Sequence, residues 1–352
     1  MRMNGALETF FPTIQAGVLS ATLLEPEHWW FMTELARHLG TTPSSLQREL
    51  ESLVSLGVLL RRHDGRRTCF KASADSPLFP DLCGPIEKTS GLEPAPNSAP
   101  KRFQIDRLKV EVHPDGESAG RAAAQEAAEY LRRMGSAQDA VAVIFATGAS
   151  QLDMLRALVA APAIPWNRIV GFHLDEYVGL DENHPASFRR YLREKLTSRV
   201  RMREFFAIDG SSPDHDAICR EYAERMRAAA PRLCLLGVGE NGHLAFNEPA
   251  EADFHDPADV KMVTLDATCR QQQTAEGWFR SIEEVPAHAI TVTIPALFRV
   301  PRLILTIPGK RKAQIVRRAF TEPISTHCPA TILRTHPDAT VYLDLDSAAE
   351  LD

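Results

Sequence analysis

The feature that most constrains this chain is a repeated alternation of strand-like and helix-like patterns beyond residue 100. Apolar runs predict buried strands at residues 140–145, 168–172, 232–236, 303–307 and 340–343. Amphipathic helical segments separate several of these runs, so we predict an α/β fold with a mostly parallel, doubly wound (Rossmann-like) sheet. Ligands of such sheets bind beyond the carboxyl ends of the strands, and the loops found there are the candidate sites.

The segment at residues 84–100 divides the chain. It is rich in Pro, Gly and Ser and poor in apolar residues, so it cannot bury a face and is typical of a linker. We therefore predict a small domain at residues 1–83 and a larger α/β domain at residues 101–352.

The small domain has the pattern of a winged helix-turn-helix. Residues 31–39 place apolar side chains on one helical face, and Thr42 and Pro43 then start a second amphipathic helix that runs to about residue 55. Two strand-like runs flank Asp64-Gly65, which is a strong hairpin signal. This order of elements resembles the winged-helix domains of bacterial transcription regulators. A small packing module without a ligand is the alternative.

Charge suggests how such a domain would meet DNA. Residues 28–74 carry seven basic and four acidic side chains, and four of the basic ones flank the hairpin tip. The second helix begins with short polar groups that suit phosphates and base edges. The candidate DNA-binding residues are Ser44, Ser45 and Arg48 on this helix, with Arg66 and Arg67 on the wing.

Composition excludes several classes of protein. The chain is 44% hydrophobic with a formal charge of −6, which is typical of a globular protein and rules out a uniformly basic nucleic-acid coat. No apolar run approaches the roughly 18 residues of a membrane span, and no signal peptide is visible. Six scattered cysteines without a CxxC pair predict reduced thiols in a cytoplasmic protein with no structural zinc and no membrane association.

The loop at residues 237–249 carries the first chemical candidates. Its glycines spell GxGxxG, but Asn247 and Pro249 interrupt the helix that a dinucleotide fingerprint requires. A flexible loop that presents Asn241, His243 and Glu248 to a cleft is the better interpretation. A histidine near a carboxylate is an effective general acid–base pair, although a lone loop histidine is usually structural.

Two other loops carry weaker signals. Asp175 and Glu176 follow the second predicted strand, where such a pair could bind a metal, act as a base, or cap the next segment. Taken alone, the pair is better interpreted as a solvated acidic turn. Residues 147–150 follow the first strand and open a helix, whose backbone N–H groups suit an anion. A turn in which Ser150 pairs with Asp153 is the alternative there.

Three motifs, FATGAS, LDEYVGL and GVGENGHLAFNEP, together closely resemble the glucosamine-6-phosphate deaminase family. The resemblance covers about residues 105–346. The neighbouring 6-phosphogluconolactonase family shares the fold but has a DER-type loop and a GHTASLFP-type loop. Tyr177 and the run at residues 245–249 favour the deaminase branch.

The resemblance implies a role for each matched position. Asp175 corresponds to the base that moves a proton between carbons 1 and 2 of the opened sugar. His243 corresponds to the group that opens the ring, with Glu248 in support. The phosphate-binding residues that it implies are Thr147, Gly148, Ala149, Ser150 and Lys312. Neither a cofactor nor a metal is expected.

Some positions depart from the family pattern. Asn241 stands where several members have aspartate, and Ala149 replaces a glycine of the phosphate loop. An arginine expected in the helix after Leu265 is missing, since Ala275 lies nearest its place, and Arg270 is the candidate to compensate. The basic residues 310–312 could each supply a phosphate charge, or could form a plain solvated helix start.

We therefore expect an isomerising deaminase that converts an amino-sugar phosphate into a ketose phosphate and ammonia. The alternatives are a 6-phosphogluconolactonase and a transcription regulator that uses the large domain as a sugar-phosphate sensor. A sensor needs no proton shuttle, so the presence of Asp175, His243 and Glu248 favours an enzyme. We also expect a cytoplasmic homo-oligomer whose further partner is DNA.

Overall fold

A computed structural model describes residues 13–26, 28–64, 67–74, 76, 79, 100–275 and 277–351. The chain divides into two compact units, Met1–Asn97 and Ser98–Asp352. The predicted linker at residues 84–100 lies outside the described residues except for Pro100. No helix within the described ranges is long and apolar enough to cross a membrane.

Within its described residues, the N-terminal unit has three helices and a small sheet. Its elements are α2 (Thr13–Leu24), β1 (Trp30–Phe31), α3 (Met32–His38), α4 (Pro43–Ser55), β2 (Leu59–Asp64) and β3 (Arg67–Ala72). Thr42 caps α4 by accepting a hydrogen bond from the backbone of Ser45 at 3.3 Å, and proline occupies the first turn. Buried side chains such as Leu35, Leu50 and Phe70 form the core of this unit.

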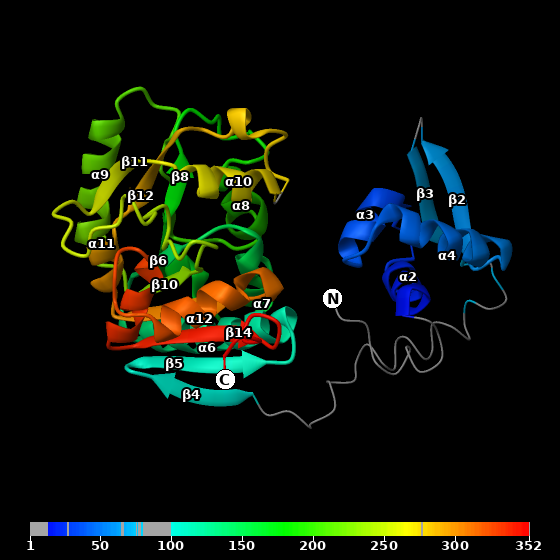
Figure 1. The fold of residues 1–352 in the computed structure, drawn as a ribbon, viewed down its shortest axis with the longest axis horizontal. Helices are drawn as coiled ribbons and strands as arrows, with labels where there is room; N and C mark the ends of the chain where they lie inside the picture. The colour runs from blue at the N-terminus through cyan, green and yellow to red at the C-terminus, as the bar shows by residue number, and fades with distance from the viewer. Residues whose placement is uncertain are drawn as a thin grey trace. The chain divides into compact units, whose positions relative to one another are not determined.

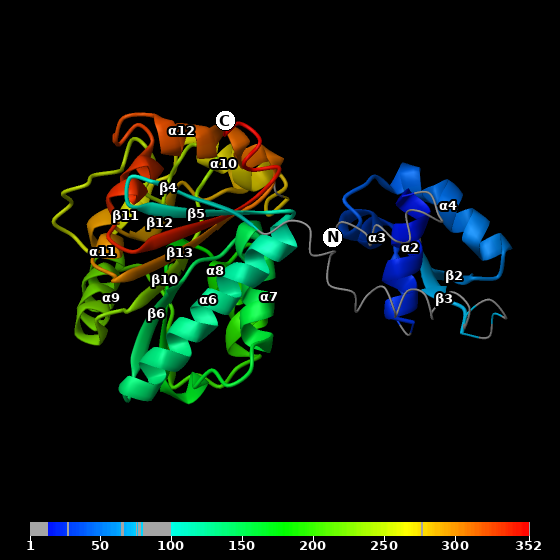
Figure 2. The same ribbon diagram turned by 90° about the horizontal axis from the view of Figure 1, so that it is seen from below.

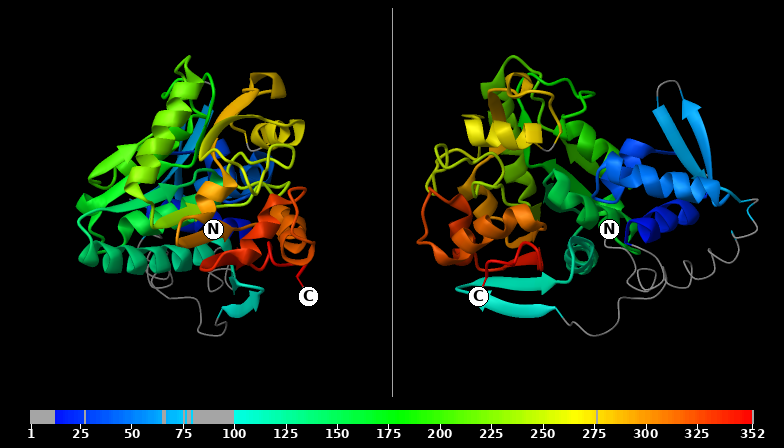
Figure 3. Two further views of the ribbon diagram at one scale, coloured as in Figure 1. Left: turned by 90° about the vertical axis from the view of Figure 1, so that its left-hand side faces the viewer. Right: turned by 45° about the vertical axis from the view of Figure 1, so that its right-hand side comes forward.

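Strands β2 and β3 form the predicted hairpin. They pair antiparallel from Leu59 with Ala72 to Asp64 with Arg67, and β1 adds to the other edge of β3. Figure 3 shows this hairpin standing clear of the helices of its own unit. Gly65 and Arg66, at the predicted turn, lie outside the described residues.

The large sheet of the C-terminal unit has eight strands, in the order β4-β5-β14-β13-β10-β6-β7-β9. In chain order they are β4 (Lys101–Ile105), β5 (Leu108–His113), β6 (Val141–Phe145), β7 (Ile169–His173), β9 (Glu204–Phe206), β10 (Leu233–Leu236), β13 (Arg302–Ile307) and β14 (Ala339–Asp344). Only the β4–β5 pair is antiparallel among them, so the predicted mostly parallel sheet is confirmed (Figure 1).

Helices cover both faces of this sheet. They are α6 (Gly116–Ala137), α7 (Leu152–Ala160), α8 (Phe188–Leu192), α9 (His215–Ala229), α11 (Ile294–Phe298) and α12 (Ala313–Thr321). A further helix, α10 (Ala267–Ala275), instead packs its Cys269 with residues of β8, β11 and β12. Along β6, Val143 packs with the core under α6 and α7, whereas Ile144 packs with the core under α9 and α12. Successive strand residues face opposite sides, which is why every residue of β6 is apolar. Figure 2 shows α6 and α12 on opposite faces.

A second, antiparallel sheet lies in the same unit. It has the order β11-β12-β8, from β8 (Asp175–Tyr177), β11 (Val260–Thr264) and β12 (His288–Val292). Asp175 pairs with Thr291 of β12, so this sheet fixes the backbone of the first predicted catalytic residue.

Candidate active site

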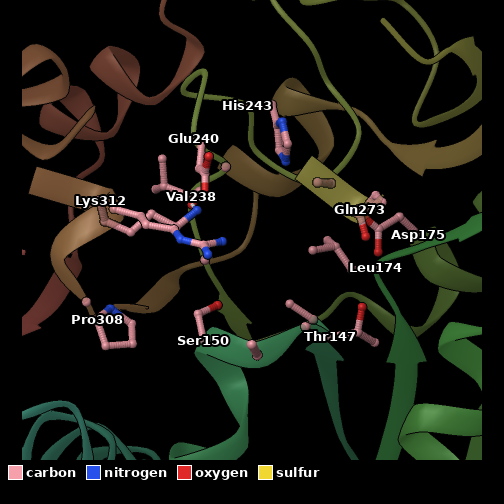
Figure 4. A pocket seen from close by; sticks show the side chains of 18 of the residues that line it. Thr147, Ser150, Leu174, Asp175, Val238, Glu240, His243, Gln273, Pro308 and Lys312 are labelled. Carbon is pink, nitrogen blue, oxygen red and sulfur yellow. Dashed lines mark hydrogen bonds between the residues drawn. The ribbon is translucent and has the colours of Figure 1, made fainter. Parts of the chain in front are cut away.

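A pocket of about 520 Å³ opens where four strands of the large sheet end. Its walls come from the segments that follow β6, β7, β10 and β13, which are near neighbours in the strand order. Figure 4 shows His243, Asp175 and Lys312 reaching in from three sides, with Thr147 and Ser150 on a fourth. The expectation that chemistry lies beyond the carboxyl ends of the strands therefore agrees with this arrangement.

The loop after β10 holds a histidine–carboxylate pair. Nδ1 of His243 lies 2.9 Å from Oε1 of Glu248, which is fully buried. Asn241 donates its side-chain amide to the other oxygen of Glu248 and accepts the backbone N–H of His243 at 3.1 Å. Asn241 thus orients Glu248 and the backbone of His243 through hydrogen bonds, without the negative charge that an aspartate would add.

Electrostatics keep Glu248 ionised in this setting. Burial alone would raise the pKa of Glu248, but the neighbouring His243 and the hydrogen bonds from His243, Cys269 and Asn241 outweigh burial and lower it. An ionised Glu248 beside Nδ1 favours the imidazole tautomer with its proton on Nδ1, which leaves Nε2 as the ring nitrogen for chemistry.

Two glycines shape the same loop. A methyl group at Gly239 would overlap the imidazole ring of His243, so only glycine allows the ring to lie against the backbone there. Gly242 adopts a φ of 94°, in the left-handed region. The glycines of the GxGxxG pattern therefore allow the tight turn of this loop and leave room for the ring of His243.

Asp175 faces the pocket from the start of β8. Its side chain lines the pocket although the residue is only 6% exposed. Burial, and next the adjacent carboxylate of Glu176, raise the pKa of Asp175 well above its usual range. A buried carboxylate with raised proton affinity is a stronger base than one in water.

Glu176 has a structural role. Its carboxylate accepts hydrogen bonds from Ser187 Oγ at 2.9 Å and from the backbone N–H groups of Phe188 and Arg189 at 3.1 and 2.8 Å. Of the roles considered for the Asp175-Glu176 pair, Glu176 therefore has that of a cap, on the first turn of α8. Tyr191 of α8 in turn donates its hydroxyl to the carbonyl of Gly148 at 2.9 Å.

The loop after β6 has the form of an anion site. Gly148 has a φ of 95°, and the chain then enters a 3-10 turn (Ala149–Gln151) that runs into α7. Thr306 of β13 donates its hydroxyl to the carbonyl of Ser150 at 3.0 Å, and Gln151 donates to Thr306. No side chain caps this helix start, so the alternative turn built on Ser150 and Asp153 is not formed. The backbone N–H groups at this helix start are suited to bind a phosphate.

The loop after β13 repeats this form with basic side chains. Gly309 has a φ of 94°, and a 3-10 turn (Lys310–Lys312) leads into α12. Asp344 accepts the N–H of Gly309 at 2.9 Å and so fixes the loop. Lys310, Arg311 and Lys312 all line the pocket, and Nζ of Lys312 donates to the carbonyl of Val238 at 2.8 Å.

The structure gives no support to Arg270 as a phosphate ligand. Its guanidinium donates to the carbonyls of Ile282 and Val285 at 2.7 and 3.1 Å, and Arg270 does not line the pocket. Gln273 of the same helix does line it, beside Asp175 (Figure 4).

Sequence reasoning missed several residues of the pocket wall. They are Phe188, Glu240, Phe246, Gln273 and Trp278. For Gln273 a signal existed, because it lies four residues after the apolar Cys269 and therefore on the same face of α10. Both residues are buried.

The candidate DNA-binding residues lie on two elements of the N-terminal unit. Ser45 and Arg48 are exposed on α4, which also contains Ser44. Arg67 begins β3, and Arg66 lies outside the described residues. Arg61 and Arg62 of β2 are exposed as well, and Arg62 stacks over the ring of Trp29 at 4.4 Å.

Comparison with known proteins places the C-terminal unit. The family model described as Glucosamine-6-phosphate isomerases/6-phosphogluconolactonase matches residues 114–342. A glucosamine-6-phosphate deaminase of Pseudarthrobacter chlorophenolicus is 36% identical over 237 residues, which are 66% of this chain and 88% of that protein.

Solved structures of the same family are similar to the C-terminal unit as well. A monomeric glucosamine-6-phosphate deaminase aligns with a TM-score of 0.63 and 29% identity, over 68% of this chain and 99% of that one. The 6-phosphogluconolactonase of Trypanosoma brucei aligns with a TM-score of 0.59 and 17% identity, over 72% and 100%, and shows the shared fold. This chain therefore belongs to the glucosamine-6-phosphate isomerase/6-phosphogluconolactonase family, on its deaminase branch.

Proposed function

We propose that this protein is a glucosamine-6-phosphate deaminase. The observation that carries the proposal is the presence, in one pocket, of a histidine–carboxylate pair and a separate buried carboxylate of raised proton affinity. An isomerising deamination needs two such groups, because ring opening and carbon-to-carbon proton transfer occur at different atoms. The deaminases among its relatives support the choice of substrate.

The reaction begins with His243. Its imidazole protonates the ring oxygen and accepts the proton of the C1 hydroxyl, which gives the open-chain aldehyde. Glu248 holds the proton on Nδ1 and stabilises the imidazolium that forms when Nε2 is protonated. Asn241 fixes Glu248 from the other side.

Asp175 then carries out the isomerisation. Its carboxylate removes the proton from C2, which leaves an enol-amine, and the proton returns at C1. Carbon 2 is then an iminium ion, to which water adds, and ammonia leaves to give fructose 6-phosphate. These steps are proton transfers and the addition of water, for which Asp175 and His243 are suited.

The two glycine turns are the proposed phosphate anchor. Backbone N–H groups of residues 147–150 and of Lys310 and Arg311 lie at helix starts beside the pocket, and Lys312 adds a positive charge. Anchoring the phosphate at this end places the other end of the sugar between His243 and Asp175.

The test is an assay of ammonium and fructose 6-phosphate from glucosamine 6-phosphate, without added metal or nucleotide. Turnover of this substrate, together with no hydrolysis of 6-phosphogluconolactone, supports the proposal. Lactone hydrolysis without ammonium release would identify a lactonase. Binding of the amino sugar without turnover would identify a sensor.

A second proposal concerns the N-terminal unit, which we infer to be a winged helix that binds DNA. Three observations support it: the element order, the exposed polar face of α4, and the exposed arginines of β2. In this arrangement α4 enters the major groove and the hairpin contacts the phosphates.

The test is the salt dependence of binding to DNA from upstream of the gene. Replacing Arg48 and Arg61 with alanine should reduce the slope of log affinity against log salt by about 0.9 for each phosphate that the protein no longer neutralises. Arg156→Ala in the C-terminal unit is the matched control, since Arg156 is exposed on α7. Failure of the unaltered protein to bind this DNA at low salt would rule out the proposal.

A further inference from the structure

A buried thiol lies next to the histidine–carboxylate pair, and the proposed reaction transfers no proton to or from it. Sγ of Cys269, a ring nitrogen of His243 and a carboxylate oxygen of Glu248 all lie within 4.8 Å of one another, and Nδ1 of His243 is 2.9 Å from Oε1 of Glu248. Cys269 is in the first turn of α10 and only 1% exposed. Its backbone N–H donates to Asp266 at 2.7 Å, which fixes the start of the helix and hence the thiol.

These three donors are a thiol, an imidazole and a carboxylate, which together are typical ligands of zinc. Around a tetrahedral zinc ion, neighbouring donor atoms stand about 3.3 to 3.8 Å apart, as bond lengths of about 2.0 to 2.3 Å require. The nitrogen and oxygen here are 2.9 Å apart and the sulfur lies within 4.8 Å of both, so the side chains must rotate to take the spacing that the ion requires. Among the described residues this is the one such group of three.

We propose that His243, Glu248 and Cys269 form an inhibitory site for a borderline-soft divalent cation, of which Zn²⁺ is the type. Thiolate and carboxylate together balance the two charges of the ion, so the buried cluster becomes neutral overall. As the ion binds, the thiol proton leaves to solvent and the ring proton of His243 moves from Nδ1 to Nε2, so that the neutral imidazole binds through Nδ1. The fourth ligand is water from the pocket, which His243 lines.

The surroundings favour binding in one respect and limit it in another. Asn241 already orients Glu248 through its second oxygen, as the outer partners of metal ligands do. Glu248 and Cys269 are buried, so the ion must enter past the imidazole, whose side chain is 12% exposed. A bound sugar phosphate occupies that entrance, and substrate should therefore slow the onset of inhibition.

Binding is tested without turnover, so the result does not depend on the proposed function. Metal-free protein is titrated with Co²⁺, a spectroscopic substitute for Zn²⁺. We expect one equivalent to produce a thiolate-to-cobalt charge-transfer band in the near ultraviolet, and Zn²⁺ to abolish it. Cys269→Ser should lose the band, while Cys219→Ser, which removes a buried thiol on α9, should keep it. A band in Cys269→Ser, or none in the unaltered protein, would overturn the proposal.

Inhibition is the second readout. Zn²⁺ should inhibit deamination reversibly, with recovery on adding chelator, whereas Mg²⁺, which prefers oxygen ligands, should not. In Cys269→Ser the Zn²⁺ concentration for half-inhibition should rise at least about tenfold relative to that variant's own turnover. Should Cys269→Ser not fold, Cys269→Ala and the cobalt spectrum of the unaltered protein serve the same purpose. Equal sensitivity in the cysteine variants and the unaltered protein would contradict the assignment.

Discussion

The two sides of the pocket are built in different ways. On the acid–base side, Asp175 and Glu248 are buried, and contacts from other side chains and strands hold them in place. On the anion side, two backbone turns at Gly148 and Gly309 approach the pocket, and the basic side chains lie at its edge. Proton transfer requires desolvated groups of altered proton affinity, whereas a phosphate requires fixed dipoles and an accessible cation.

From this contrast we infer that the acid–base side of the pocket determines the rate of the reaction and the anion side determines the affinity for substrate. Changes on the acid–base side should remove transition-state stabilisation and lower kcat. Changes on the anion side should remove binding that substrate and transition state share, which raises KM instead. The following experiments test that division.

The largest effect is expected for Asp175→Asn. Asparagine keeps the size and the β8–β12 pairing but cannot accept the C2 proton, so kcat for ammonium release should fall at least about a hundredfold. Binding of the sugar phosphate, measured by calorimetry, should persist. Thermal unfolding is the control: burial of an ionised carboxylate is unfavourable, so Tm should be equal to or above that of the unaltered protein. Near-normal turnover would remove Asp175 from the mechanism.

His243→Gln should lower kcat by about tenfold or more. The loss is smaller than for Asp175→Asn because amino-sugar phosphates also open their rings without a catalyst. The experiment measures two rates in this variant: steady-state turnover, and exchange of the C2 proton with solvent when the substrate is supplied in its open form. Only the first rate should fall, because the second does not require ring opening. If ring opening and turnover are both unchanged, the histidine is structural.

Gly239→Ala tests whether the position of the imidazole matters. The new methyl group would displace the ring of His243, and kcat should fall toward that of His243→Gln. Adding the same change to His243→Gln should have little further effect, because the two act on one group. Additive losses in the double variant would show that Gly239 acts elsewhere.

On the anion side, Lys312→Ala should raise KM by about tenfold with kcat little changed, as loss of shared binding requires. Arg270→Ala is the matched control, because Arg270 bonds carbonyls of its own region and does not line the pocket. Its KM should stay near the normal value. A reversed pattern would restore Arg270 as the phosphate ligand and exclude Lys312.

The smallest effect concerns pH. The base must be ionised, and the pKa of Asp175 is raised by burial and by Glu176. Activity should therefore be lost, as pH falls, at a higher pH than the ordinary carboxyl range near 3.9 would give. The acid limb of kcat/KM measures this. Glu176→Gln removes the neighbouring negative charge, so the pKa of Asp175 should fall and the acid limb should move to lower pH. An acid limb that does not move would show that burial alone raises the pKa of Asp175.

Much of this architecture could be predicted because it is local. Buried strands such as β6 and the helix that begins at Thr42 follow from apolar periodicity and capping residues. The loops after β6 and β10 followed from the same pattern, since parallel strands bring their carboxyl ends to one edge.

The remainder depends on contacts between distant segments. The pairing of β8 with β12 joins residues more than a hundred positions apart, and no local pattern marks it. Arg270 does not line the pocket in this structure, because each helical residue turns the direction by about 100° and its side chain instead bonds the carbonyls of Ile282 and Val285. Gln273, one turn after Cys269, faces the pocket.

Helix α8 has a consequence for substrate choice. The carboxylate of Glu176 fixes its first turn next to Asp175, and Tyr191 ties it to the carbonyl of Gly148 in the phosphate loop. One short helix thus sets the distance between the proposed phosphate site at Gly148 and the proposed base, Asp175. If the sugar binds through its phosphate and reacts at the opposite end, that distance selects the number of carbons between the phosphate and the reacting carbon. A phosphate one carbon shorter or longer would present the wrong carbon to Asp175.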